Sequence, residues 1–180
     1  MPTPEDSPPD PVSPYGVAKL AAERYCVSFS RVYESFEAVV LRYFNVFGPR
    51  QSPYSQYAAA VPLFITKIAA GEQIDVYGDG EQSRDFTFVG NVVDATLRAG
   101  DAAGANGQIF NVAAGSPASV NQVAETISAI VGKPVRRREL PQRAGDLRDS
   151  WADLSKSQRL LGYAPETTLE EGLRRTVEFL

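Results

Sequence analysis

Apolar residues recur at helical spacing in several parts of the chain, and short continuous apolar runs separate these parts. The first helical pattern covers about Pro14 to Tyr33. Its apolar stripe consists of Ala18, Ala22, Tyr25, Phe29, Val32 and Phe36. A neighbouring face carries Tyr15, Lys19, Glu23 and Cys26. The stripe is therefore expected to bury against a core or a partner helix, while the second face points elsewhere.

The rest of the chain alternates between strand-like and helix-like patterns. Strands are predicted over residues 38–43, 74–77, 85–89, 108–112 and 135–140, and further helices over 59–70, 91–99, 120–131, 154–161 and 168–180. Ser119 and Gln122 form a capping box, and Thr168 with Glu171 marks another helix start. The alternation of strands and helices predicts an α/β fold, in which strand 38–43 belongs to a parallel sheet.

Composition narrows the class of protein. Hydrophobic residues make up 43% and charged residues 22% of the 180 residues, which suits a packed core. The net charge of −4 argues against nucleic acid as the main partner. We expect no membrane span, because no apolar run approaches about 20 residues. The proline-rich start is unlike a secretory signal. A single cysteine, Cys26, allows no internal disulfide and suits a reducing, cytoplasmic compartment.

The residue types that are missing limit the chemistry. The chain contains no histidine, so histidine-activated nucleophiles and histidine-containing metal sites are excluded within it. One cysteine provides no thiolate cluster, and no metal site is expected. Acid–base chemistry must therefore come from tyrosine, lysine, a carboxylate or a cofactor.

Tyr15 and Lys19 form the strongest candidate for such chemistry. They lie four residues apart, so both side chains share one helix face. Ser13 is a good N-cap and Pro14 a good first helical residue, which places Tyr15 in the first turn. The helix dipole and the ammonium both favour a phenolate there. The alternative is an exposed aromatic and an exposed lysine on an ordinary surface helix.

Three further stretches combine ligand-binding residue types. Residues 41–50 read LRYFNVFGPR and leave a buried strand at its carboxyl end, where α/β proteins often bind ligands. Residues 77–86 read YGDGEQSRDF, where Arg84 is suited to clamp a diphosphate. Residues 143–150 read RAGDLRDS, where Arg143 suits a phosphate and Asp146 a ribose hydroxyl. Each stretch alone also fits an ordinary turn or a solvated loop.

Taken together and in order, these stretches resemble the extended short-chain dehydrogenase/reductase family. Within it, they resemble the NAD-dependent epimerases of the UDP-glucose and UDP-N-acetylglucosamine 4-epimerase type. The stretches SPYGVAKLAAE, LRYFNVFGPRQ, YGDGEQSRDF, IFNVA and RAGDLRDSWADLSKSQRLLGYAP carry the resemblance, which covers almost all of the chain past residue 10. The implied reaction transfers a hydride from sugar C4 to NAD, passes through a 4-keto sugar, and returns the hydride to the other face.

The resemblance also implies roles for individual residues. Tyr15 is the implied catalytic base, and Lys19 holds the nicotinamide ribose. The residues expected at the cofactor are these two with Tyr43, Phe44 and Val46. The residues expected at the UDP-sugar are Asn45, Ala60, Val61, Tyr77, Arg84, Arg143, Asp146 and Ser150. Ser150 matches a position that limits the size of the sugar, and its small side chain predicts that 2-N-acetyl sugars are accepted as well.

The resemblance implies an incomplete version of the family's fold. Residues 1–12 are expected to be a flexible arm, 13–50 a remnant of the Rossmann domain, and 51–180 mainly a small α/β substrate-binding domain, with 91–113 returning to the core sheet. The chain has no G-x-x-G-x-x-G fingerprint for the dinucleotide. We therefore expect the C-terminal part of such an enzyme, with unpaired edges and exposed apolar faces at strands 38–43 and 108–112. The complete enzyme is expected to be a homodimer.

Two alternatives to the epimerase stay open at this point. One is a dehydratase or decarboxylase of the same family, acting on a nucleotide sugar. The other is an inactive fragment that serves only in binding or dimerisation. By itself, the 180-residue chain is expected to bind NAD weakly or not at all and to lack turnover.

Overall fold

Parallel strand pairs form the centre of the fold. The computed structural model describes residues 2–54, 59–142, 145 and 147–180. The parallel pairs are β1 (Val40–Tyr43) with β6 (Ile109–Val112), β2 (Asn45–Phe47) with β5 (Phe86–Phe88), and β3 (Gln73–Tyr77) with β8 (Arg136–Leu140). Because parallel strands require long crossover connections, these pairs confirm the predicted α/β class.

A smaller sheet joins three short strands from distant parts of the chain. β4 (Ser83–Arg84) lies between β7 (Ala118–Ser119), to which it is antiparallel, and β9 (Asp149–Ser150), to which it is parallel. The register places Ser150 opposite Arg84. The sequence pattern predicted neither β7 nor β9, because strands of two residues leave no periodicity.

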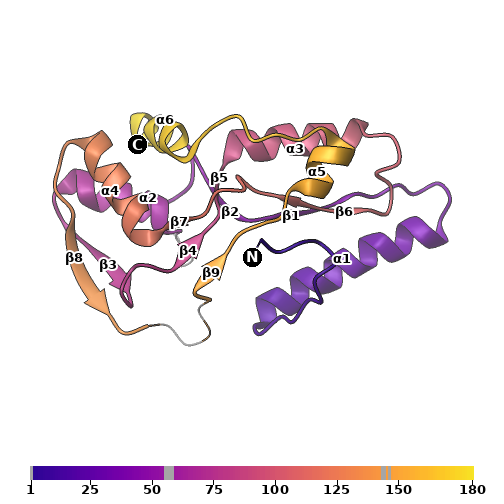
Figure 1. Cartoon of the computed structure of the whole chain (residues 1–180), viewed down its shortest axis with the longest axis horizontal. Coiled ribbons are helices and arrows are strands. Elements are labelled where there is room, and N and C mark those ends of the chain that lie inside the picture. The colour runs from indigo at the N-terminus through magenta and orange to yellow at the C-terminus, as the bar shows by residue number, and fades with distance from the viewer. Residues whose placement is uncertain (1, 55–58, 143–144, 146) are drawn as a thin grey trace.

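Helices cover the strand pairs at both ends of the molecule. Figure 1 shows α3 (Val89–Asp101) and α5 (Ser155–Leu161) on one side of the β1–β6 pair, and α1 (Pro14–Val32) on the other. At the opposite end, α2 (Ala60–Ala70), α4 (Val120–Val131) and α6 (Leu169–Phe179) gather beside β3 and β8. Each end has its own apolar cluster, one built around Ile65, Ile68 and Ile127 and the other around Phe110, Val112 and Tyr163.

The predicted helix starts are confirmed by their caps. Ser13 Oγ accepts a hydrogen bond from Gly16 N at 3.1 Å. Ser119 and Gln122 exchange both hydrogen bonds of a capping box. Thr168 Oγ1 accepts from Glu171 N at 3.3 Å. These side chains satisfy amides that a helix start otherwise leaves without partners, so the boundaries are set locally.

The burial of α1 differs from the predicted pattern. Tyr25, Phe29 and Val32 of the apolar stripe are exposed, and the buried residues of α1 are Glu23 and Val27. The stripe therefore does not bury in the core of this chain. Helical periodicity identified an apolar face, but it could not tell which element covers that face.

Strands 38–43 and 108–112 are better covered than expected. They pair with each other as β1 and β6, so neither lacks a neighbour on both edges. Phe110 and Val112 of β6 are fully buried within the second apolar cluster. The expected exposed apolar face is therefore wrong for β6. On β1, Tyr43 is exposed.

The arm at the start of the chain is attached by hydrogen bonds at residues 3 and 5. Thr3 N donates to Trp151 O at 2.9 Å, and Asp153 N donates to Thr3 O at 3.0 Å. Asn111 of β6 donates through its side chain to Thr3 O at 2.9 Å and through its backbone to Glu5 Oε1 at 2.8 Å. These contacts fix the path of the arm toward Ser13 and α1.

Asp85 joins segments that lie far apart in the sequence. It sits between β4 and β5 and has no exposed surface. Its carboxylate accepts hydrogen bonds from Ala114 N at 2.7 Å and Gly115 N at 3.0 Å, with a longer contact of 3.4 Å from Ala152 N. Burial raises the pKa of Asp85, while these amides act in the opposite direction. The Asp85 carboxylate therefore serves as the hydrogen-bond acceptor for several amides at once.

We predict that Asp85→Ala destabilises the protein by about 2 kcal/mol or more, because it leaves buried amides without an acceptor. Asp149→Ala removes a carboxylate from the exposed end of the neighbouring strand and is expected to cost about 1 kcal/mol or less. Urea denaturation of both variants measures the difference. Equal losses would contradict a special role for Asp85.

A pair of helical glycines gives a second prediction. A Cβ atom at Gly172 of α6 would lie 2.8 Å from Phe88 Cδ2 and 2.9 Å from Phe47 Cζ, whereas one at Gly100 of α3 meets nothing within 4 Å. Gly172→Ala should therefore cost about 1–3 kcal/mol through overpacking. Gly100→Ala should add up to about 1 kcal/mol through helix propensity. Thermal denaturation should move the two melting temperatures in opposite directions.

Candidate functional site

Tyr15 and Lys19 lie together at the start of α1, as their spacing predicts. The side chain of Tyr15 is 73% exposed. Lys19 Nζ lies 5.3 Å from the centroid of the Tyr15 ring. The cap at Ser13 fixes this turn, so the phenol and the ammonium remain neighbours on one face.

A cleft of about 730 Å³ lies between this part of α1 and strand β1. Residues of the arm, of α1 and of β1 line it, among them Tyr15, Lys19, Glu23, Arg42 and Tyr43. The hydroxyl of Tyr43 hydrogen-bonds Thr96 Oγ1 of α3 at 2.9 Å. Tyr15 and Lys19 therefore face an open space whose far wall is strand β1.

Arg42 and Glu23 form the strongest ion pair of this cleft. Arg42 Nε and Nη2 donate to the two carboxylate oxygens of Glu23 at 2.7 and 2.9 Å. Arg42 Nη1 also donates to Glu5 O at 3.0 Å. Hydrogen bonds from Arg42 lower the pKa of the Glu23 carboxyl, against the opposing effect of burial. The pair joins α1, β1 and the arm at one point.

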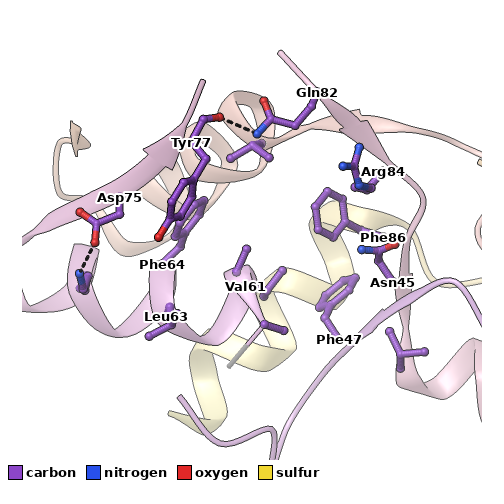
Figure 2. Close-up of a pocket in the computed structure, with 15 residues that line it drawn as sticks. Asn45, Phe47, Val61, Leu63, Phe64, Asp75, Tyr77, Gln82, Arg84 and Phe86 are labelled. Carbon is purple, nitrogen blue, oxygen red and sulfur yellow. Dashed lines mark hydrogen bonds and ion pairs between the residues drawn. The ribbon is translucent and has the colours of Figure 1, made fainter. Parts of the chain in front are cut away.

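A second cavity, of about 380 Å³, lies between β2, α2, β3, β4 and β5. Figure 2 shows Asp75 and Tyr77 on one side of this pocket, and Asn45, Arg84 and Phe86 on the other. Val61 and Phe64 of α2 supply apolar wall between the two sides. The pocket thus combines flat and apolar surface with a guanidinium and an amide, as small-molecule sites commonly do.

Most of the predicted substrate residues meet in this pocket. Its lining includes Asn45, Ala60, Val61, Tyr77 and Arg84, together with Val46, which was predicted at the cofactor. Their placement together agrees with the prediction, although their roles toward a ligand stay predictions. Ser150 pairs with Arg84 across strands β4 and β9. Arg143 and Asp146 lie outside the described residues.

The remaining cofactor candidates separate along one short segment. Tyr43 lines the α1 cleft, Phe44 packs against the second apolar cluster, and Asn45 opens into the pocket. The alternation of strand side chains explains this division. One backbone segment therefore connects the two cavities.

Sequence reasoning missed several pocket residues. The additional lining includes Leu63, Phe64, Lys67, Asp75, Gln82, Phe86 and Val120. Phe64 lies within the predicted helix 59–70, and Gln82 lay inside the stretch 77–86 that was already noted. Asp75 left no sequence signal, because its partner Arg138 comes from strand β8.

Charged partners surround Asp75 at the edge of the pocket. Arg138 Nε donates to Asp75 Oδ1 at 2.7 Å, and Lys67 Nζ lies 3.8 Å from Oδ2. The hydrogen bond from Arg138 is the main cause that lowers the pKa of Asp75. Asp75 is therefore a charged acceptor on the pocket wall at neutral pH.

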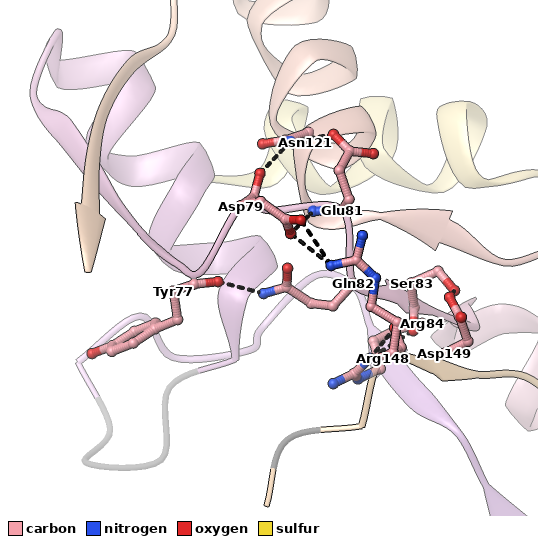
Figure 3. A network of polar contacts seen from close by, with 9 residues as sticks. All are labelled: Tyr77, Asp79, Glu81, Gln82, Ser83, Arg84, Asn121, Arg148 and Asp149. Carbon is pink, nitrogen blue, oxygen red and sulfur yellow. Dashed lines mark hydrogen bonds and ion pairs between the residues drawn. The ribbon is translucent and has the colours of Figure 1, made fainter. Parts of the chain in front are cut away.

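A polar network holds the turn between β3 and β4. Figure 3 shows Arg148 reaching Asp79, whose two carboxylate oxygens lie 2.8 and 2.9 Å from Arg148 Nη1. Asn121 Nδ2 donates to Asp79 O at 2.9 Å and to Glu81 Oε1 at 2.6 Å. Gly80 has φ +75° and lies against Asn121, so a side chain there would clash. The network fixes the backbone of the turn that leads into Gln82.

The described residues limit other kinds of site. They contain no group of three or more histidine, cysteine or acidic residues placed to hold a metal ion. None of the helices in the described part of the chain combines the length and apolar character needed to cross a bilayer.

Residues 1–113 match the family model described as "NAD dependent epimerase/dehydratase family". A UDP-glucose 4-epimerase of Mycolicibacterium smegmatis is 40% identical over 178 residues, which is 99% of this chain and 56% of that protein.

Solved structures show the same fold over nearly the whole chain. A UDP-glucose 4-epimerase of Thermotoga maritima, solved with UDP-glucose, superposes with a TM-score of 0.94 at 41% identity and covers 99% of this chain and 57% of its own. A UDP-N-acetylglucosamine 4-epimerase of Methanobrevibacter ruminantium, solved with UDP-N-acetylmuramic acid, has a TM-score of 0.93 at 40% identity, with coverages of 99% and 57%.

The chain therefore spans only a little over half the length of these relatives. The family match extends from the arm and the Tyr15–Lys19 helix through strand β6. On the strength of that match, this chain belongs to the NAD dependent epimerase/dehydratase family.

Proposed function

We propose that this chain supplies the acid–base pair and the nucleotide pocket of an NAD-dependent UDP-sugar 4-epimerase. The observation that supports this best is the course of residues 43–46. They connect the cleft at Tyr15 and Lys19 with the pocket that contains Asn45 and Arg84. A substrate whose nucleotide lies in the pocket can thus extend its sugar toward the phenol. The relatives named as UDP-sugar 4-epimerases support the same reaction.

In this proposal, Tyr15 takes the proton of the sugar C4 hydroxyl and later returns it. A tyrosine can do so when its phenolate is stabilised, and Lys19 beside the ring supplies positive charge. The exposure of Tyr15 leaves its hydroxyl accessible from the cleft. The hydride exchange at C4 would be the chemistry that bound NAD supplies.

The residues present fit one end of the dinucleotide. The cleft offers the Lys19 ammonium and the hydroxyls of Tyr15 and Tyr43, which are suitable partners for ribose hydroxyls. The chain contains no glycine-rich turn that opens a helix and could bind the pyrophosphate. The nicotinamide and its ribose are thus assigned to Tyr15, Lys19, Tyr43, Phe44 and Val46, and the rest of the cofactor to parts outside this chain.

The pocket is assigned to the nucleotide of the substrate. Its Tyr77 side suits a flat base and its Arg84 side suits a diphosphate, because guanidinium groups bind phosphate oxygens in pairs. Ala60 and Val61 contribute wall, and Asn45 contributes an amide. Arg143 and Asp146 are proposed as further contacts to phosphate and ribose. Ser150 is proposed at the sugar.

We also propose a homodimer in the cytoplasm for the complete enzyme. The exposed stripe of α1, with Tyr25, Phe29 and Val32, is an apolar surface that a second copy can cover. The single cysteine is free and exposed, which suits a reducing compartment.

The first test is nucleotide binding by the 180-residue chain. We predict that calorimetry detects UDP binding, and that Arg84→Gln weakens it about tenfold or more through the loss of a charge-assisted contact. Arg98→Gln removes an arginine that pairs with Asp94 on α3 and should leave the affinity unchanged. Unchanged binding in Arg84→Gln, or no UDP binding at millimolar concentration, would contradict the assignment of the pocket.

The second test concerns sugar size in a complete enzyme that contains this segment. Ser150→Tyr should lower the turnover of UDP-N-acetylgalactosamine relative to UDP-galactose by about tenfold or more, because added bulk excludes the N-acetyl group. Tyr15→Phe in the same enzyme should abolish turnover of both sugars. An unchanged ratio in Ser150→Tyr would show that this residue does not limit sugar size.

A further inference from the structure

The ion pair between Arg42 and Glu23 stands out because its carboxylate is buried beside the proposed catalytic residues. Glu23 is 7% exposed, and both of its carboxylate oxygens are bound by Arg42. A bidentate pair of this kind fixes the geometry of the carboxylate as well as its charge. Because Arg42 occupies both oxygens, Glu23 is less available to other cations nearby.

The Arg42–Glu23 pair matters because Glu23 lies one helical turn from Lys19 on α1. Tyr15, Lys19 and Glu23 follow one another at intervals of four residues, so they lie on one face of the helix. All three line the same cleft. A carboxylate one turn after a lysine is within reach of the ammonium, although Lys before Glu is the weaker of the two orientations. Such a pair would draw the ammonium away from Tyr15.

Other charged and titratable groups around the cleft do not replace Arg42. Arg24 Nε lies 4.0 Å from Glu23 on the exposed side of the helix. The Glu5 carboxylate accepts from Asn111 N at 2.8 Å and thus points toward β6. Asp10 from the arm, Cys26 from α1 and Tyr43 from β1 are the other titratable residues in the lining of the cleft. Arg42 is the cation that contacts both oxygens of Glu23 in the described structure.

We propose that Arg42 is a positioning residue that holds Glu23 away from Lys19, so that the ammonium stays beside the phenol of Tyr15. The importance of this arrangement for the reaction rests on the proposed role of Tyr15 as the base. The arrangement itself is electrostatic and can be measured without cofactor or substrate. Arg42 contacts neither sugar nor cofactor in this proposal and acts through Glu23 and Lys19.

The experiment follows the deprotonation of Tyr15 by NMR in the 180-residue chain labelled with [¹³Cζ]tyrosine, with Tyr15→Phe to assign the signal. In Arg42→Met, Glu23 is released and pairs with Lys19. The midpoint of Tyr15 deprotonation should rise by about 0.15–0.4 pH unit, the size of an i,i+4 ion pair converted at 1.36 kcal/mol per pH unit. The double variant Arg42→Met/Glu23→Gln should return the midpoint to its original value.

A Lys19→Met background separates the proposed route from a direct effect of the arginine charge. There, Arg42→Met should leave the midpoint unchanged, because no ammonium is left for Glu23 to capture. A shift that persists without Lys19 would overturn the proposal, and so would a single variant that titrates like the original chain. The matched control is Arg98→Met, which breaks the Arg98–Asp94 pair on α3 at 2.7 Å and should shift nothing.

A second variant protects the test against loss of folding, which circular dichroism monitors. Arg42→Lys keeps one positive charge but loses the bidentate contact. It should shift the midpoint in the same direction by a smaller amount, again only when Lys19 is present. If the chain titrates as proposed but a complete enzyme lacks epimerase activity, then the proposed function fails and the electrostatic arrangement stands.

Discussion

The parallel pairing of β1 with β6 and of β2 with β5 is the constraint on which the rest of the structure depends. These strands follow each other directly in the chain, and yet they pair with different partners. Residue 44 is the single step between them. Side chains before residue 44, such as Tyr43, line the cleft of α1, and side chains after it, such as Asn45, line the pocket. The distance between the two cavities is thus fixed by backbone hydrogen bonds rather than by loops.

Buried polar groups support that arrangement from both sides. Asp85 accepts from amides of residues 114 and 115, and Asn111 connects β6 with the arm. Each of these groups is costly to bury without partners, so each specifies one arrangement of the segments that it joins. Arg84 and Phe86, the neighbours of Asp85, both line the pocket. The position of this part of the pocket wall therefore depends on a carboxylate that does not itself line the pocket.

Several features of the fold and of the candidate site could be predicted from the sequence, because they are determined by residues close together in the chain. The cap at Ser13 and the interval between Tyr15 and Lys19 follow from helix geometry alone. Asn45 and Arg84 were recognisable from their motifs. The pairing of β3 with β8, which brings Arg138 to Asp75, depends on residues more than 60 positions apart and left no local signal. The outward direction of the α1 stripe was equally hidden, because periodicity does not name the covering element.

The weak attachment of α1 has a consequence for dynamics. This helix contacts the remaining chain through Glu23, Val27 and their neighbours and presents its aromatic residues to solvent, whereas the pocket lies on elements that share a large apolar cluster. Local opening free energies follow buried apolar contact. Amide hydrogens of α1 should thus exchange ahead of those in α2 and α4. The proposed nucleotide pocket and the proposed acid–base pair consequently belong to regions of unequal rigidity.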